Sequence, residues 1–288
     1  MTARTLQPFD AAAVAPWSLG DGSRGVLLVH GFAGTPPELR RLGEHLAANG
    51  WYCFAPALPG HALTPEDLHH STWREWAAAV RAGLDEVAAR CAGVAVAGQS
   101  MGGALALHCA ATDMRVQAVA SLATPVRLPG QLQHLLPVIS RVVRWHRPGS
   151  DVDLWDPTAV EELYSYGLRS TRAILELKRL LAAVSDELAQ IRAPVLVIHG
   201  ARDRTIDPRS ADELERRLIC SAAVEKRVYP RSGHAVSVDV DRDNVNRRVS
   251  EWFDRWVPSA AAEQTPGGLT VEHRVRRRTL IDRPPLSA

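Results

Sequence analysis

Short apolar runs alternate with longer helical patterns along most of the chain, and this alternation constrains the fold more than any other feature. The first run, Val26–Val29, is continuously apolar and is bounded by Gly25 and His30. A strand buried on both faces has this pattern. Strands that alternate with helices form a mostly parallel sheet with helices on both faces. The sequence therefore predicts an α/β fold, with further strands at 51–55, 94–97, 116–122, 195–198 and 224–229 and helices at 73–90, 101–111, 210–218 and 242–256.

Two of the helix starts carry a T-x-x-E pattern, Thr35 with Glu38 and Thr72 with Glu75. In a capping box of this kind, the threonine hydroxyl and the glutamate carboxylate each accept a backbone N–H of the first turn. We therefore expect one capped helix after Thr35, ending near Gly50, and a second after Thr72.

The segment Gly98–Gly102 reads Gly-Gln-Ser-Met-Gly and matches the G-x-S-x-G motif. It lies between an expected strand and an expected helix, which is the context of the nucleophile elbow in the α/β-hydrolase fold. The sharp turn at the serine requires small neighbours two residues away, and Gly98 and Gly102 meet that requirement. Ser100 is therefore the predicted nucleophile.

A serine nucleophile needs a base, and the base needs an acid that orients it. In this fold the chain order is serine, then aspartate or glutamate, then histidine. Asp203 follows the penultimate expected strand and His234 follows the last one, so both lie where α/β sheets build their sites. We predict His234 as the base and Asp203 as the acid. Asp207 is the alternative acid, although its place before a proline at a helix start suits a cap better. His30, His61 and His199 are expected to be structural, because the first two precede Ser100 and His199 precedes the acid. The remaining histidines lie on helical patterns, have no strand-end context or lie in the tail.

The oxyanion of an acyl-transfer intermediate needs two backbone N–H groups. The residue after the nucleophile, Met101, is expected to supply one. Phe32 in the glycine-flanked loop His30–Gly34 is expected to supply the other. A plain glycine turn between strand and helix is the alternative interpretation of that loop.

The alternation stops between about Val126 and Gln190, where we find helical patterns and no convincing strand. An inserted helical segment needs a surface on which to bury its apolar residues, so we expect a cap over the active site. A separate small helical domain is the alternative. The expected division of the chain is thus 1–125 and 191–257 for the two parts of the core, 126–190 for the cap, and 258–288 for a disordered basic tail. Weak contact of this tail with an anionic membrane surface is a second interpretation.

Other classes of protein find little support. No dinucleotide or P-loop motif is present, and Asp151–Asp156 lacks the glycine and glutamate of a calcium loop, so a turn is expected there. Four cysteines without C-x-x-C spacing predict reduced thiols and no zinc site. We expect no cofactor and no metal. The net charge of +2 does not suggest a nucleic-acid partner. With no apolar N-terminal region and no apolar run of membrane-spanning length, a cytoplasmic location is expected.

The sequence contains the segments His30–Pro36, Pro59–His61, Gly98–Gly103, His199–Gly200 with Asp203, and Ser232–His234. Together these segments resemble the bacterial carboxylesterase and monoacylglycerol lipase family over roughly Gly25 to Val257. The resemblance implies hydrolysis of short- to medium-chain esters or monoacylglycerols under a small helical cap, without a cofactor. Two departures concern acyl-chain preference: Ala62 replaces the last glycine of the usual Gly-His-Gly, and Gln99 replaces a frequent Leu or His.

The predicted reaction is thus an acyl transfer through Ser100 and water, with a small-molecule ester as the substrate. Thioesterase, carbon–carbon hydrolase and perhydrolase chemistry on the same residues are alternatives. A non-catalytic ligand-binding protein with this fold is an alternative of a different class.

Overall fold

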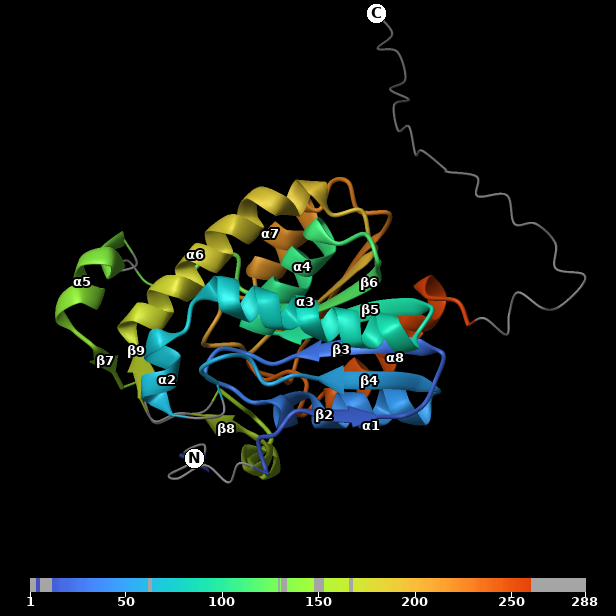
Figure 1. The fold of residues 1–288 in the computed structure, drawn as a ribbon, viewed down its shortest axis with the longest axis horizontal. Helices are drawn as coiled ribbons and strands as arrows, with labels where there is room; N and C mark the ends of the chain where they lie inside the picture. The colour runs from blue at the N-terminus through green and yellow to red at the C-terminus, as the bar shows by residue number, and fades with distance from the viewer. Residues whose placement is uncertain are drawn as a thin grey trace, which may run out of the picture.

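The computed structural model describes residues 4–5, 12–61, 64–128, 130, 134–147, 153–165 and 168–259. A seven-stranded sheet in the order β11-β10-β6-β5-β3-β4-β2 forms its centre (Figure 1). Neighbouring strands from β11 to β4 run parallel, and only β2 pairs antiparallel, with β4. The strands of this sheet are β2 (Trp17–Leu19), β3 (Arg24–Val29), β4 (Trp51–Ala55), β5 (Gly93–Gln99), β6 (Val116–Leu122), β10 (Val195–Gly200) and β11 (Val224–Tyr229).

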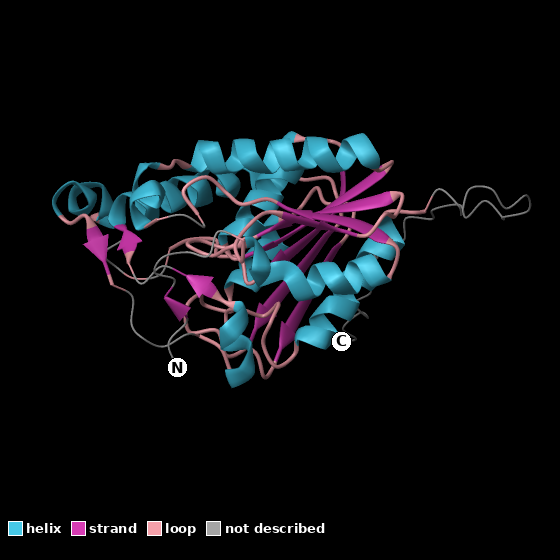
Figure 2. Cartoon of the chain, turned by 60° about the horizontal axis from the view of Figure 1, so that its bottom comes forward, coloured by secondary structure: helices cyan, strands magenta, loops and turns pink. Residues whose placement is uncertain are grey.

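Helices cover both faces of this twisted sheet, which confirms the predicted α/β architecture (Figure 2). Helices α1 and α8 lie on one face, and α3, α4, α6 and α7 lie on the other. The α-helices are α1 (Arg40–Ala48), α2 (Pro65–His70), α3 (Trp73–Arg90), α4 (Met101–Thr112), α5 (Leu136–Val142), α6 (Thr171–Glu187), α7 (Ser210–Arg217) and α8 (Arg242–Trp256), and the 3-10 helices are η1 (Pro36–Leu39), η3 (Pro157–Glu162) and η4 (Leu188–Gln190).

The apolar run in β3 serves two cores. Val26 and Leu28 pack with α1 and α8, while Leu27 and Val29 pack with α3, α4 and α6. Successive side chains of a strand point to opposite faces, so a strand covered on both faces must be apolar at every position. The interpretation of Val26–Val29 as a doubly buried strand is therefore confirmed.

One of the two predicted capping boxes is wrong. At α3, the Thr72 hydroxyl accepts the N–H of Glu75 at 3.4 Å and the Glu75 carboxylate accepts the N–H of Thr72 at 2.7 Å, as predicted. At η1, the Thr35 hydroxyl makes no capping hydrogen bond. The Glu38 carboxylate accepts the N–H of Gly31 at 2.8 Å instead. A partly buried donor in a neighbouring loop has thus taken the acceptor that the box would need.

The expected insertion contains two different parts. Helix α6 packs against α3 and α4, and its buried side chains, including Leu180, belong to the core of that face. Helix α5 has no buried residue and lies at the far end of the molecule, next to α6 (Figure 1). The expectation of no strand was wrong in detail, because three two-residue strands occur: β7 (Trp145–His146) pairs with β9 (Arg169–Ser170), and β8 (Tyr164–Ser165) pairs with β1 (Arg4–Thr5).

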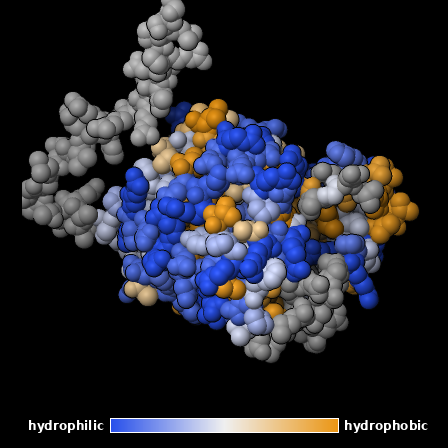
Figure 3. Space-filling view, turned by 180° about the vertical axis from the view of Figure 1, so that it is seen from behind, coloured by the Kyte–Doolittle hydropathy of each residue, from blue (hydrophilic) through white to orange (hydrophobic). Residues whose placement is uncertain are grey.

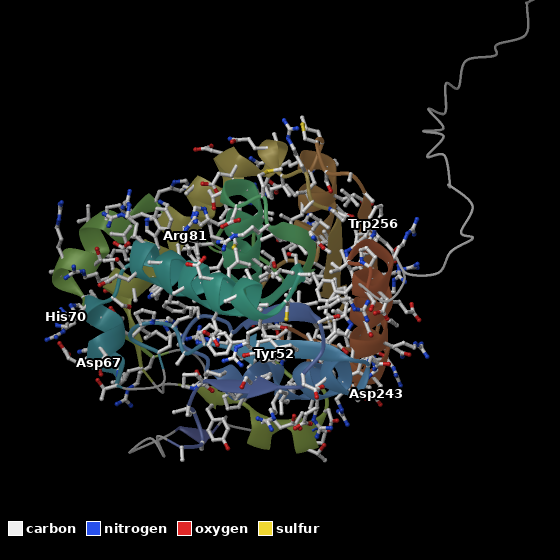
Figure 4. All side chains as sticks on the ribbon, turned by 45° about the vertical axis from the view of Figure 1, so that its right-hand side comes forward. Tyr52, Asp67, His70, Arg81, Asp243 and Trp256 are labelled. Atoms are coloured by element: carbon white, nitrogen blue, oxygen red, sulfur yellow. The ribbon has the colours of Figure 1, made fainter. Side chains whose placement is uncertain are left out.

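Charged side chains lie mainly on the outside. Asp67, His70 and Asp243 are exposed, and Figure 4 shows polar side chains of this kind around the periphery. Buried charge is expensive unless it is paired or hydrogen-bonded, so buried carboxylates require an explanation. Most of them gather in loops beside the carboxyl ends of β10 and β11: Asp153, Asp203, Asp239 and Asp241.

All four cysteines are free, and Cys220 is the exposed one. None of the helices in the described ranges is long and apolar enough to cross a membrane. The predictions for Ala62 and for the tail from residue 260 onward lie outside the described residues.

Candidate active site

Ser100 lies between the last residue of β5 and the first residue of α4. Its backbone has φ 54° and ψ −115°, a strained conformation for a residue with a side chain. A Cβ on Gly98 would lie 2.1 Å from the Gly102 carbonyl oxygen, and one on Gly102 would lie 2.0 Å from the Val29 carbonyl oxygen. The turn therefore requires glycine at both positions, as the elbow motif predicts.

The structure brings Ser100, His234 and Asp203 together at the carboxyl edge of the sheet. The Nε2 atom of His234 lies 2.9 Å from the Ser100 Oγ, and its Nδ1 atom lies 2.8 Å from the Asp203 Oδ2. The three residues follow β5, β11 and β10, whose ends meet at one edge. This continuous hydrogen-bonded chain has the geometry of a serine nucleophile, a base and an orienting acid.

Asp203 is buried and fully hydrogen-bonded. His199 Nε2 lies 2.9 Å from its Oδ2, and the N–H groups of Thr205 and Ile206 donate to its Oδ1 at 2.9 and 2.8 Å. Burial alone would raise the pKa of Asp203, but the hydrogen bonds from His199 and His234 outweigh it and hold the pKa below its ordinary range. Asp203 is thus ionised at neutral pH and can stabilise a positively charged His234.

Asp207, the alternative acid, lies elsewhere. Its carboxylate is half exposed and pairs with Arg209 at 2.6 Å, away from the histidine. It accepts the backbone N–H of Arg209, the N-cap residue of α7. The geometry of the cluster therefore favours Asp203.

The two expected oxyanion donors belong to α4 and to the loop after β3, a strand that pairs with β5 up to Val29 and Gly98. Met101 is the first residue of α4, where a helix leaves its N–H groups without intrahelical partners. Phe32 lies in the loop after β3, next to Ala33, which has φ 57°. Within the described part of the chain, neither the Phe32 nor the Met101 N–H has a hydrogen-bond partner. Both are therefore available to a developing negative charge.

Buried groups beneath the loop hold its shape. The Nδ1 of His30 lies 2.9 Å from the Gly31 carbonyl, and its Nε2 accepts the N–H of Leu58 at 3.1 Å. Burial lowers the pKa of His30 to about 4, so the ring is neutral and one nitrogen is free to accept. Burial raises the pKa of Glu38, whose carboxylate accepts the Gly31 N–H from the other side. His30 thus has the structural role predicted for it.

Sequence reasoning missed a contact of Gln99. Its Nε2 donates to the backbone carbonyl of His234 at 2.6 Å and so joins the elbow to the loop after β11 that carries the base. In the sequence Gln99 is only a departure from a family pattern, since no local signal points to a partner 135 positions away.

A second serine–histidine pair also exists. The Ser170 hydroxyl lies 2.9 Å from the Nδ1 of His69. Ser170 is fully buried, and its hydroxyl caps α6 by accepting the N–H of Ala173 at 3.1 Å. A buried capping hydroxyl cannot meet a substrate, so this pair is structural.

An elbow serine, a histidine and a buried aspartate at the edge of a mostly parallel, doubly covered sheet define a serine hydrolase of the α/β-hydrolase fold. Residues 22–241 match the profile of the hydrolase family described as serine aminopeptidase, S33, and the chain belongs to that family.

Characterised relatives agree with the resemblance predicted from the sequence. The chain is 31% identical over 249 residues to the thermostable monoacylglycerol lipase of Bacillus sp. (strain H-257), which covers 83% of this chain and 93% of that protein. It is 25% identical over 242 residues to a carboxylesterase of Bacillus subtilis (strain 168), covering 83% and 96%. A solved structure from work on the metagenome-derived lipolytic enzymes LipS and LipT superposes with a TM-score of 0.80 at 25% identity, covering 86% of this chain and all of that one.

Proposed function

We propose that this chain is a serine hydrolase that cleaves carboxylic esters, namely short- to medium-chain acyl esters or monoacylglycerols. The observation that carries the proposal is the hydrogen-bonded chain from Ser100 through His234 to Asp203, with contacts of 2.9 and 2.8 Å. The ester class is supported by the relatives, which are named monoacylglycerol lipase and carboxylesterase.

In the proposed mechanism each residue has one step. Ser100 Oγ attacks the ester carbonyl carbon while His234 Nε2 takes the hydroxyl proton, and ionised Asp203 stabilises the resulting imidazolium. The N–H groups of Phe32 and Met101 bind the tetrahedral oxyanion. The intermediate collapses, the alcohol leaves with the proton from His234, and Ser100 carries the acyl group. Water, deprotonated by His234, then releases the acid and restores the serine.

Substitution of the nucleophile tests this assignment. We expect Ser100→Ala to lower kcat on p-nitrophenyl esters by about 10⁴-fold or more and to abolish labelling by a fluorophosphonate probe. Ser170→Ala is the matched control, because it removes the other histidine-bonded serine and should keep both activity and labelling. An active, labelled Ser100→Ala variant would show that another residue attacks the ester.

The substrate class is tested by kcat/KM over a chain-length series of p-nitrophenyl esters and monoacylglycerols. Acyl-thioester and aminoacyl-anilide substrates serve as comparisons for the thioesterase alternative and for the peptidase description of the family. A preference for either comparison substrate over every ester would overturn the proposed class.

A cap role for part of the insertion belongs to the same proposal. Four residues in and beside α5 are exposed and apolar, Leu135, Val138, Val142 and Val143, and Figure 3 shows hydrophobic surface gathered at that end of the molecule. We assign the cap to about 126–170 of the expected 126–190, because α6 packs with the core. A cytoplasmic location and the absence of a cofactor stay predictions.

A further inference from the structure

The segment from Asp153 to Asp156, in the insertion, runs beside the loop that carries the base. The N–H groups of Trp155 and Asp156 donate to Asp239 Oδ1 at 2.9 and 2.7 Å. The other carboxylate oxygen of Asp239 accepts the N–H of Gly233 at 2.6 Å. Asp239 is fully buried, so its carboxylate joins the insertion to the residue that precedes His234.

Asp153 contacts the acid loop, which follows β10 and carries Asp203, and the base loop, which follows β11 and carries His234. Its Oδ2 accepts the N–H groups of Arg204 and Thr205 at 2.5 and 2.8 Å and the Thr205 hydroxyl at 3.1 Å. Its backbone carbonyl accepts the N–H of His234 at 3.1 Å. One buried residue of the insertion thus holds the acid loop by its side chain and the base by its main chain.

The contact with Thr205 reaches the triad directly. The Thr205 N–H is shared between Asp153 Oδ2 at 2.8 Å and Asp203 Oδ1 at 2.9 Å. This leaves Asp203 Oδ2 for His199 and His234. A shift of Thr205 would therefore turn the Asp203 carboxylate and change its hydrogen bond to the base.

We infer that Asp153 is a positioning residue for the proposed triad, through which the insertion sets the geometry of the acid and the base. The inference rests on the proposed function. It also gives a role to an acidic segment for which the sequence predicts only a turn. The side chain of Asp153 binds backbone N–H groups, so it acts as an anchor for a loop and not as a metal ligand.

The test compares Asp153→Ala and Asp153→Asn with Asp207→Ala, an exposed acid on the loop after β10 that also carries Asp203. The concentration of active sites is measured by titration with a fluorophosphonate probe. Unfolded protein is thereby left out of the enzyme concentration from which kcat is calculated. We expect Asp153→Ala to lower kcat by about 10- to 100-fold, the scale of an ångström-level misplacement, with little change in KM. Asp153→Asn keeps a carbonyl oxygen for the two N–H groups and should retain most of the activity. Asp207→Ala should match the wild type.

The pH profile separates positioning from stability. The acidic limb of kcat/KM reports the protonation of the base. Asp203 and Glu38 act on His234 electrostatically, and Asp153 and Asp239 are the other buried acids hydrogen-bonded to its loop. A weakened bond to Asp203 stabilises the imidazolium less, so the acidic limb of Asp153→Ala should move to lower pH. A purely structural role would lower the melting temperature and leave the limb in place. An unchanged kcat and limb in Asp153→Ala would overturn the inference, as would equal losses in the Ala and Asn variants.

Gly233→Ala tests the same contact if Asp153→Ala does not fold. A Cβ there would lie 2.7 Å from Asp153 Oδ1 and 2.8 Å from its carbonyl oxygen, and would push the two segments apart. We expect the same direction of change in kcat and in the acidic limb, and wild-type values for both would contradict the inference. Where both variants fold, the double variant should lose less than the product of the single losses, because the clash with Oδ1 is gone. If these variants behave like the wild type while fluorophosphonate labelling still depends on Ser100, the inference about Asp153 is wrong and the proposed function stands.

Discussion

Thr35 and Thr72 stand in the same sequence pattern, but their hydroxyl groups have different surroundings. Thr72 caps α3 and its box is complete. The hydroxyl of Thr35 is buried and has no hydrogen-bond partner among the described residues. A buried polar group without a partner destabilises the folded state, whereas a hydroxyl that caps a helix stabilises it.

This contrast predicts opposite effects of one substitution. Thr72→Val should lower the free energy of unfolding by about 1 kcal/mol, the usual value of an N-cap. Thr35→Val keeps the shape and removes an unsatisfied hydroxyl, so it should be neutral or should stabilise by up to about 1 kcal/mol. Urea unfolding of both variants measures the two values. An equal loss in Thr35→Val would mean that its hydroxyl does cap the helix.

The surroundings of a side chain also explain which site residues the sequence could predict and which it could not. Ser100, Asp203 and His234 each follow a recognisable strand, and chain order in the fold gave each a candidate role. Asp153 and Gln99 bind backbone groups 51 and 135 positions away. A sequence does not show which backbone groups will be hydrogen-bond partners, because every residue has a carbonyl and every residue except proline has an N–H.

At the scale of elements, α5 and α6 both have helical patterns, and the sequence placed them in one insertion. Periodicity identifies an apolar face but not the surface that covers it. In the structure α6 buries its face on α3 and α4, while α5 buries none of its residues. The two-residue strands β7, β8 and β9 were missed because they are too short for alternation to be detected.

Two substitutions test this difference between the helices. Leu180 in α6 is fully buried, so Leu180→Ala should lower the free energy of unfolding by about 2–5 kcal/mol. Val142 at the end of α5 is 80% exposed, so Val142→Ser should change it by less than about 0.5 kcal/mol.

The two variants should also differ in catalysis. If α5 belongs to the cap, Val142→Ser should raise KM for long acyl chains and leave p-nitrophenyl acetate hydrolysis unchanged. A chain-length profile identical to that of the wild type would exclude α5 from the acyl-binding surface. A loss well below the predicted range in Leu180→Ala would show that α6 is not part of the core.

At the scale of the whole molecule, two buried histidines link stability to pH. His30 and His61 lie side by side beneath the loop of Phe32, with ring centroids 5.2 Å apart. Burial lowers the pKa of His30 to about 4 and that of His61 to about 3. An unfolded chain protonates both near pH 6.5, so the unfolded state binds more protons than the folded state over the interval between these values.

Stability should therefore be complete above pH 6.5 and should fall as the pH drops toward 4. Each histidine contributes a slope of about 1.4 kcal/mol per pH unit in this interval, or about 2.7 kcal/mol for the pair. Asp203, whose pKa is lowered by folding, acts below this interval, because its unfolded pKa lies near 4. Glu38, whose pKa burial raises, opposes part of the fall, because the folded state protonates it first. Since a folded domain is stable by only about 5–15 kcal/mol, the two histidines alone should bring the protein close to unfolding near pH 4.

Denaturant unfolding at half-unit steps of pH measures the slope. His61→Phe, which suits a site already lined by Phe32 and Trp76, should halve it, and exposed His146→Gln should not change it. A His61→Phe slope equal to that of the wild type would mean that other groups set the acid stability.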